Sequence, residues 1–164
     1  MAAGATYEPI ATTTLGSAQA SVTFSSLGSY TDLVLVFNGA GSTDINLLLQ
    51  FNADTGSNYS GTFLGGNGSS AISARSSNLA HIAVNYQGYI QTGFVSNAII
   101  NIQNYSNSTT YKTVLSRFNN SATGVDATIG LWRNTAAITS VLAKTHTGTF
   151  STGSTFTLYG IAAA

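Results

Sequence analysis

The chain has 164 residues, enough for one domain with a substantial core. Hydrophobic residues make up 43%, only 6% are charged and the formal net charge is zero, so Ser, Thr, Asn and Gly must keep the surface wet in place of charge. The five scattered cations argue against a nucleic-acid partner, and the absence of Cys excludes disulfides and zinc–thiolate sites. A neutral surface of this kind tolerates close protein neighbours.

The N-terminal segment MAAGATYEP has neither a basic region nor an apolar run, so we expect no signal peptide. The longest aliphatic run, Leu33 to Phe37, is too short to span a membrane, and no membrane partner is expected. Residues 1–14, which contain the only Pro, are predicted to form an N-terminal arm or an edge strand. Residues 15–164 are predicted to form a single domain.

Period-two alternation predicts strands along most of the chain, and helical periodicity is nearly absent. In chain order the predicted strands cover 20–25, 33–37, 45–52, 59–64, 79–86, 94–105, 111–118, 127–133, 138–146 and 154–161. Tyr111, Thr113 and Leu115 should share one side of their strand. The segment SSAISARSSN, residues 69–78, is the least strand-like and is predicted as a loop or one helical turn. Eight to ten short strands with polar turns predict an all-β fold, an antiparallel β-sandwich of jelly-roll type.

The stretch FNADTGSNYS, residues 51–60, offers several oxygen atoms and raises the question of a calcium loop. Asp54 is its only carboxylate and no Glu follows it, whereas a calcium loop of the EF-hand type needs several acidic ligands. We therefore predict a turn. Asp54 should bond its own backbone in an Asx-turn, Gly56 should take a positive φ, and Asn58 suits the left-handed region.

No motif in the chain predicts catalysis or a cofactor. Residues 66–71 match the dinucleotide pattern G-x-G-x-x-A formally, but no helical pattern follows, so we predict a loop. His81 and His146 are the only imidazoles, and no G-x-S-x-G motif is present. His81 is predicted to be a strand residue and His146 has no carboxylate near it in sequence. We therefore expect no enzyme, no metal and no cofactor.

Aromatic residues supply the candidate contact positions. Trp132, the only Trp, and Arg133 should point to opposite faces of a strand. We expect Trp132 in the core or in a subunit interface, and a sugar-stacking platform is the alternative. Tyr side chains suit protein interfaces and sugar surfaces alike. The candidate interface residues are Tyr7, Pro9, Tyr30, Tyr86, Tyr89, Trp132 and Arg133.

The combination of FNADTGSNYS, GNGSSA, YKTVLS, GLWRNTAAITS and FSTGSTFTLYGI resembles a group of small tailed-phage virion proteins, common in phages of cyanobacteria and other aquatic bacteria. The resemblance covers chiefly residues 33–70 and 111–161. It implies kinship with capsid decoration (cement) proteins and with the β-rich heads of tail fibres, and it transfers no catalytic residue. This chain has Ala53 where the family pattern has Gly. Residues 71–105 match least and are expected to carry partner-specific surface.

The resemblance and the nearly uncharged surface predict a phage virion structural protein, a capsid decoration or cement protein on the capsid exterior. The expected partners are the major capsid protein and copies of the chain itself, with a homotrimer favoured over a dimer. The protein would be made in the host cytoplasm and localise to the virion. The alternative is a tail-fibre or carbohydrate-binding receptor-recognition module, whose partner would be a glycan.

Overall fold

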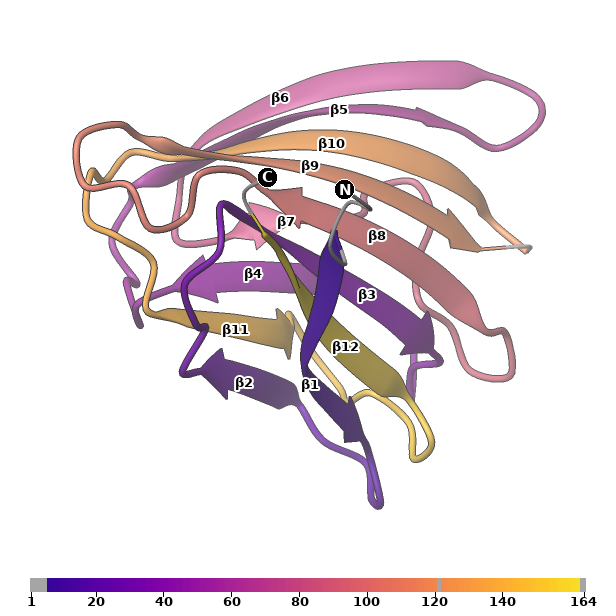
Figure 1. Ribbon diagram of the computed structural model, residues 1–164. Coiled ribbons are helices and arrows are strands. Elements are labelled where there is room, and N and C mark those ends of the chain that lie inside the picture. Colours follow the sequence, from indigo (N-terminus) through magenta and orange to yellow (C-terminus); the bar gives the residue numbers. More distant parts are fainter. Residues whose placement is uncertain (1–5, 121, 163–164) are drawn as a thin grey trace.

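The computed structural model describes residues 6–120 and 122–162, and its regular structure there consists of β-strands (Figure 1). In chain order the strands are β1 (Tyr7–Thr14), β2 (Ser21–Ser25), β3 (Asp32–Gly39), β4 (Leu47–Phe51), β5 (Tyr59–Gly66), β6 (Ala71–Leu79), β7 (Ile82–Ala83), β8 (Ser96–Ile102), β9 (Lys112–Asn120), β10 (Gly124–Trp132), β11 (Ser140–Thr145) and β12 (Thr155–Ile161). The predicted all-β class is confirmed, with twelve strands in these residues in place of the expected eight to ten.

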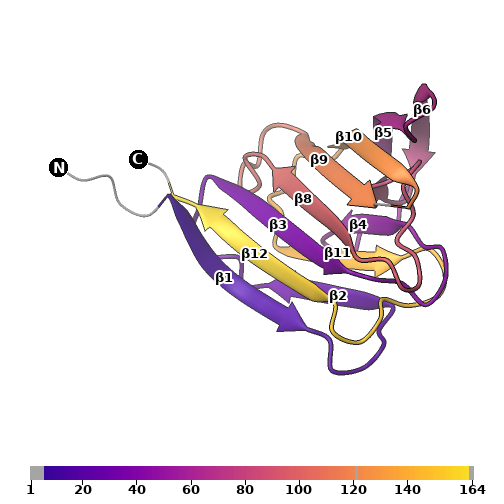
Figure 2. The same ribbon diagram turned by 90° about the vertical axis from the view of Figure 1, so that its right-hand side faces the viewer.

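The strands form two antiparallel sheets that pack as a β-sandwich (Figures 1 and 2). The eight-stranded sheet has the order β1-β12-β3-β8-β9-β10-β5-β6, and the four-stranded sheet has the order β2-β11-β4-β7. We call the side of the large sheet that faces the small sheet its inner face, and the opposite side its outer face. This strand order does not establish jelly-roll connectivity, which stays a prediction.

The core lies between the two sheets. β3 contributes Leu33, Leu35 and Phe37, which have no exposed surface, and β4 is buried at every residue. The rings of Phe37, Phe150 and Phe156 pack with centroids 4.9–5.6 Å apart, in the tilted and edge-on arrangements that aromatic pairs prefer. Burial of these apolar side chains is the dominant favourable contribution to folding.

Most of the segment predicted as a loop or helical turn, residues 69–78, belongs to the edge strand β6 instead. β6 pairs antiparallel with β5. In the turn between them Gly68 has a φ of +85°, and Oδ1 of Asn67 accepts hydrogen bonds from the N–H groups of Ser69 and Ser70 (3.0 and 2.9 Å). Hairpin pairing therefore imposes a strand on a Ser-rich sequence of weak strand propensity.

The predicted strand at residues 79–86 is mostly absent: its first residue ends β6, and the rest contains the two-residue strand β7. Beyond it, the carboxylate of Asp126 on β10 accepts three hydrogen bonds of 2.8–3.0 Å from the backbone N–H groups of residues 86–88. A backbone whose N–H groups point at a carboxylate cannot donate them to a neighbouring strand. The segment therefore leaves the sheet soon after β7.

Strand β1 forms one edge of the large sheet by pairing with β12 (Figure 2). The register shifts between Pro9 and Ala11, and an edge position of this kind is one of the few places where a sheet accepts Pro. Residues 1–14 were predicted to form an arm or an edge strand, and residues 7–14 form an edge strand. Residues 1–5 lie outside the described residues.

Candidate functional site

Strand β10 presents its aliphatic side chains to the outer face of the large sheet. Asp126, Thr128 and Trp132 are buried on the inner side, whereas Val125 and Ile129 are 57% and 58% exposed. A strand with one covered face normally shows the reverse, with apolar side chains inward and polar side chains outward. The contacts made on each face of β10 explain why its aliphatic side chains point outward.

The polar side chains on the inner side find their partners within the chain. The hydroxyls of Ser116 and Thr128 donate to the carbonyl oxygen of Val84 at 3.2 and 3.3 Å. Lys112 of β9 is also buried, and its Nζ donates to the carbonyl oxygens of residues 110 and 135 at 2.7 and 3.1 Å. Hydrogen-bonded polar groups are tolerated in a core, so the inner face accommodates them and the aliphatic residues of β10 remain on the surface.

Exposed apolar side chains of neighbouring strands lie beside those of β10. Ile129 is directly opposite Leu115 of β9, which is 46% exposed, and Ala127 is opposite Leu64 of β5, which is 61% exposed. We define the outer apolar surface as Leu64, Ile99, Leu115, Val125, Ala127 and Ile129. Contiguous exposed apolar residues on a folded domain mark an interaction site more often than single ones do.

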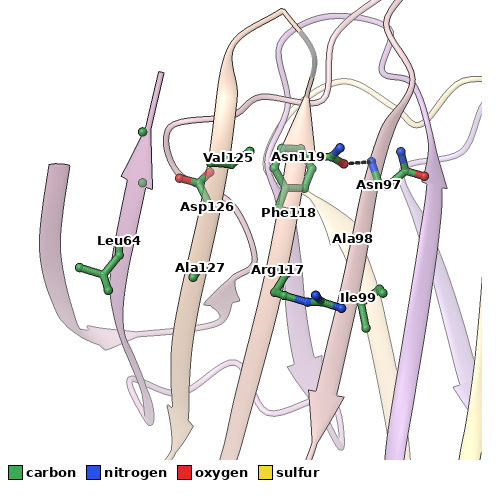
Figure 3. A pocket seen from close by; sticks show the side chains of 12 residues that line it. Leu64, Asn97, Ala98, Ile99, Arg117, Phe118, Asn119, Val125, Asp126 and Ala127 are labelled. Carbon is green, nitrogen blue, oxygen red and sulfur yellow. Dashed lines mark hydrogen bonds between the residues drawn. The ribbon is translucent and has the colours of Figure 1, made fainter. Parts of the chain in front are cut away.

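A hollow of about 710 Å³ opens on this surface across β5, β8, β9 and β10 (Figure 3). Leu64, Ile99, Val125 and Ala127 belong to its lining, which is mostly apolar. Its volume falls within the roughly 300–1,000 Å³ that binding pockets occupy. A second hollow of about 330 Å³ lies beside Tyr30, in another part of the molecule.

Apart from Asp126, whose carboxylate accepts hydrogen bonds from backbone N–H groups, the polar side chains that line the larger hollow present hydrogen-bond donors. Arg117 is exposed and extends beside Ile99 (Figure 3), and its guanidinium has no hydrogen-bond partner within residues 6–120 and 122–162. Oδ1 of Asn119 accepts a hydrogen bond from the backbone N–H of Asn97 (3.2 Å), and Oδ1 of Asn97 accepts one from the side chain of Asn38. The amide oxygens are thus used inside the sheet, whereas the side-chain NH₂ groups of Asn97 and Asn119 face no acceptor in the described part of the chain.

The interface residues predicted from the sequence do not gather on one surface. Tyr7 and Pro9 lie on β1, at the edge of the large sheet. Tyr30 is half-buried, and its hydroxyl donates to the carboxylate of Glu8 at 3.2 Å. Tyr86 is half-buried and stacks on a phenylalanine of β5 with centroids 4.3 Å apart, and Tyr89 is exposed in the loop before β8.

Trp132 and Arg133 both hold the turn after β4, and their placement on opposite faces stays a prediction. Trp132 is wholly buried, and its indole N–H donates to Oδ2 of Asp54 at 2.7 Å. Of the two expectations for Trp132, the structure supports the core position and leaves the ring no surface for a partner. Arg133 donates through Nη2 to the carbonyl oxygen of Ser57 (2.7 Å) and to Oδ1 of Asn78 (3.1 Å).

The stretch at residues 51–60 is a turn whose carboxylate is used by the chain itself. Oδ1 of Asp54 accepts a hydrogen bond from the N–H of Gly56 (2.8 Å), which confirms the predicted Asx-turn, and Oδ2 accepts from the side chains of Asn58 (2.9 Å) and Trp132. Burial raises the pKa of Asp54, but the hydrogen bonds from Trp132, Asn58 and Gly56 outweigh it and hold that pKa below its ordinary value. The arrangement is that of a structural corner.

The left-handed residues of this turn are not the predicted ones. Asn52 and Ala53 have φ values of +53° and +55°, and the N–H of Asp54 donates to the carbonyl oxygen of Phe51 at 2.9 Å. Two successive positive φ values closed by this bond are typical of a type I′ turn, which favours Asn-Gly. The prediction for Gly56 was wrong because the chain reverses earlier, directly after β4. A Gly would fit the position of Ala53 without strain.

Residues 66–71, the formal match to a dinucleotide motif, join the antiparallel strands β5 and β6, and a strand follows them where the motif needs a helix. The prediction of a loop is confirmed for residues 67–70.

The two histidines lie near cations. His81 precedes β7 and is half-buried, and burial, followed by the positive charges of Lys144 and His146, lowers its pKa. Nδ1 of His146 accepts a hydrogen bond from the backbone N–H of Asn46 at 3.0 Å. A catalytic His needs a carboxylate or similar group to orient it. The charged neighbours that lower the pKa of His81 are cations and not carboxylates. Within the described residues no three His, Asp or Glu side chains gather as a metal site would require.

In the part of the chain that the structure describes, no helix has the length and hydropathy needed to cross a membrane. No known protein family, curated protein or solved structure matches this chain.

Sequence reasoning missed the outer apolar surface and Arg117. The available signal was the run VDATIGL at residues 125–131, in which every second residue is apolar. That alternation by itself assigns these residues to the core side of a strand, and only the hydrogen-bond partners of Asp126 and Thr128 reveal the opposite orientation.

Proposed function

We propose that the chain is a virion structural protein of a tailed phage, a capsid decoration or cement protein that adheres to capsid subunits through its outer apolar surface. The observation that supports adhesion most directly is the exposure of Val125 and Ile129 on β10, opposite a face that buries Asp126. The assignment to a phage virion rests on the resemblance carried by the turn and strand motifs of the sequence.

The composition of the surface suits a protein partner. In the lining of the hollow, aliphatic side chains lie among Asn and one Arg, the mixture expected at protein interfaces, whose centres are depleted of charge. A contact of standard size buries roughly 1,600 Å², and many copies attached to one particle would add their weak contacts by multivalency. A homotrimer is the favoured assembly at a local three-fold axis of a shell, and a dimer is the second choice.

A glycan-binding module of a tail fibre is the second candidate and has less support. Sugar-binding surfaces use exposed aromatic faces, because these suit the apolar face of a pyranose. The outward-facing residues of β5, β8, β9 and β10 within the described residues include no aromatic side chain. Phe118, which borders the hollow, is only 3% exposed and belongs to the inner side.

The double variant Leu115→Ser with Ile129→Ser tests the proposal, because it removes apolar area from the outer face without touching the core. Particles that lack the protein should regain resistance to heat and osmotic shock when wild-type protein is added, and the double variant should fail to attach. Thr23→Ala, which removes an exposed side chain from β2 of the small sheet, is the control and should attach normally. Normal attachment of the double variant, or particles equally stable without the protein, would contradict the proposal.

A further inference from the structure

We propose that the hollow on the outer face receives an Asp or Glu side chain of the protein partner, flanked by aliphatic residues, and that Arg117 is the cation that binds it. This inference rests on the proposed function and describes the partner of that surface by its chemistry.

Arg117 lies within the surface that adhesion would cover. Its cross-strand neighbours are Ile99 on one side and Ala127 on the other, so a protein seated on these residues also covers the guanidinium. Burying an unpaired cation is strongly unfavourable, since the ion loses its water without gaining a partner. The described part of the chain offers Arg117 no hydrogen-bond partner. A stable contact therefore requires an anion from the partner.

The other polar groups of the hollow favour the same ligand. The side-chain NH₂ groups of Asn97 and Asn119 have no acceptor in the described residues, whereas their amide oxygens already accept hydrogen bonds. Arg117, Asn97 and Asn119 together thus present donors almost exclusively. A carboxylate has two oxygens with about four acceptor sites and matches the planar guanidinium bidentately, which a neutral hydroxyl or amide does not.

The charges of the outer face also favour an acidic ligand. β5, β6, β8, β9 and β10 together contain one carboxylate, Asp126, which faces inward and is occupied by backbone N–H groups. Arg75 of β6 lies opposite Thr62, which lies opposite Ile129, so Arg75 shares the outer face with Arg117. A chain without net charge thus carries a locally positive face, which attracts and orients an acidic partner.

The walls of the hollow define what flanks the carboxylate. Leu64 and Val125 border the hollow and are more than half exposed. They gain free energy only when apolar groups cover them. The occupant is therefore an acidic residue between aliphatic residues, and a run of consecutive acidic residues would leave these walls uncovered.

Two blocked peptides test this chemistry without the natural partner: acetyl-Gly-Leu-Glu-Leu-Gly-amide and the same peptide with Gln in place of Glu. Titrated into ¹⁵N-labelled protein, the Glu peptide should shift the amide signals of residues 97–99, 117–119 and 125–127, and should bind at least about fivefold more tightly than the Gln peptide, the advantage expected of a charge-assisted bond. Arg117→Gln should abolish this preference. Lys144→Gln, which removes a cation from the small sheet, should retain it. Equal binding of the two peptides, or shifts confined to other strands, would overturn the inference.

Measuring how the variants attach to the particle distinguishes a failure of this inference from a failure of the proposed function. Arg117→Gln should weaken attachment about tenfold or more and reduce its salt dependence, because the lost contact is ionic. If the Leu115 and Ile129 double variant fails to attach while Arg117→Gln attaches with wild-type affinity and salt dependence, the carboxylate site is wrong and adhesion stands. If both variants attach normally, adhesion through this face is wrong, and the peptide titration still decides the carboxylate site.

Discussion

Val114 and Leu115 are neighbours in β9, yet Val114 is 1% exposed and Leu115 is 46% exposed. Val114 lies on the inner face of the large sheet and Leu115 on the outer face. The two faces are not simply apolar inside and polar outside. The inner face holds Lys112 and Asp126 among its apolar residues, and the outer face holds aliphatic side chains around Arg117. The difference is that the polar groups of the inner face have partners within the chain.

The polar side chains of the two faces follow one rule, which depends on where their hydrogen bonds end. A polar side chain whose hydrogen bonds end on the chain itself has a structural task, as with Asp126 and Asp54. A polar side chain amid exposed apolar residues, with no partner in the described part of the chain, is available to another molecule, as with Arg117. Substitutions on the two faces should therefore affect different measurements, stability in one case and binding in the other.

The largest effect is expected for Asp126→Ala. The change leaves the N–H groups of residues 86–88 without their acceptor in a partly buried setting, at a cost of about 3 kcal/mol in the free energy of unfolding. Urea denaturation followed by fluorescence measures it. Asp44→Ala, an exposed carboxylate, is the control and should change stability little. A loss below about 1 kcal/mol would show that the inner polar groups are not needed.

The neighbouring pair in β9 tests the two faces directly. Val114→Ala creates a cavity in the core and should lower the free energy of unfolding by about 2 kcal/mol. Leu115→Ala removes a larger side chain but should cost less than about 0.5 kcal/mol, because that side chain contacts water. Parallel urea titrations give both values. Equal losses would mean that Leu115 is packed and that the outer apolar surface is not an exposed one.

Sequence reasoning reached the strands and the central turn because both depend on local signals. Alternation located β2, β9 and β12, and a continuous apolar run located β3. The exposure of Tyr111, Thr113 and Leu115, with the residues between them buried, confirms that the three share one side. It failed where distant residues decide the outcome. Asp126 and Thr128 turn inward because their partners lie about 40 residues earlier in the chain, and no period in residues 125–131 contains that information.

Asp54→Asn sharpens the rule, because Asp54 is a carboxylate with internal partners near the surface. Asn keeps one acceptor oxygen, so at pH 7 the loss should be about 1–2 kcal/mol after allowing for partial exposure. The folded-state pKa of Asp54 lies below its ordinary value. Its stabilisation is therefore fully present above the unfolded pKa of about 3.9 and is lost as pH falls through the folded pKa. Urea titrations at pH 7 and pH 3 should show the difference between wild type and variant shrinking at the lower pH. A difference that stays constant would mean that the charge of Asp54 contributes nothing.

The smallest effect on stability is expected for Arg117→Gln. Because its guanidinium has no hydrogen-bond partner in the described residues and is exposed on β9, the free energy of unfolding should change by less than about 0.3 kcal/mol, within the range of ordinary surface substitutions. The same variant should lose its preference for the Glu peptide, so one substitution leaves folding intact and removes binding. Arg133→Gln is the contrasting control, since Arg133 donates to the turn at Ser57 and to Asn78, and it should reduce stability measurably. A loss above about 1 kcal/mol for Arg117→Gln would mean that the chain itself uses this cation, and the distinction between satisfied inner groups and available outer groups would then fail at its most important residue.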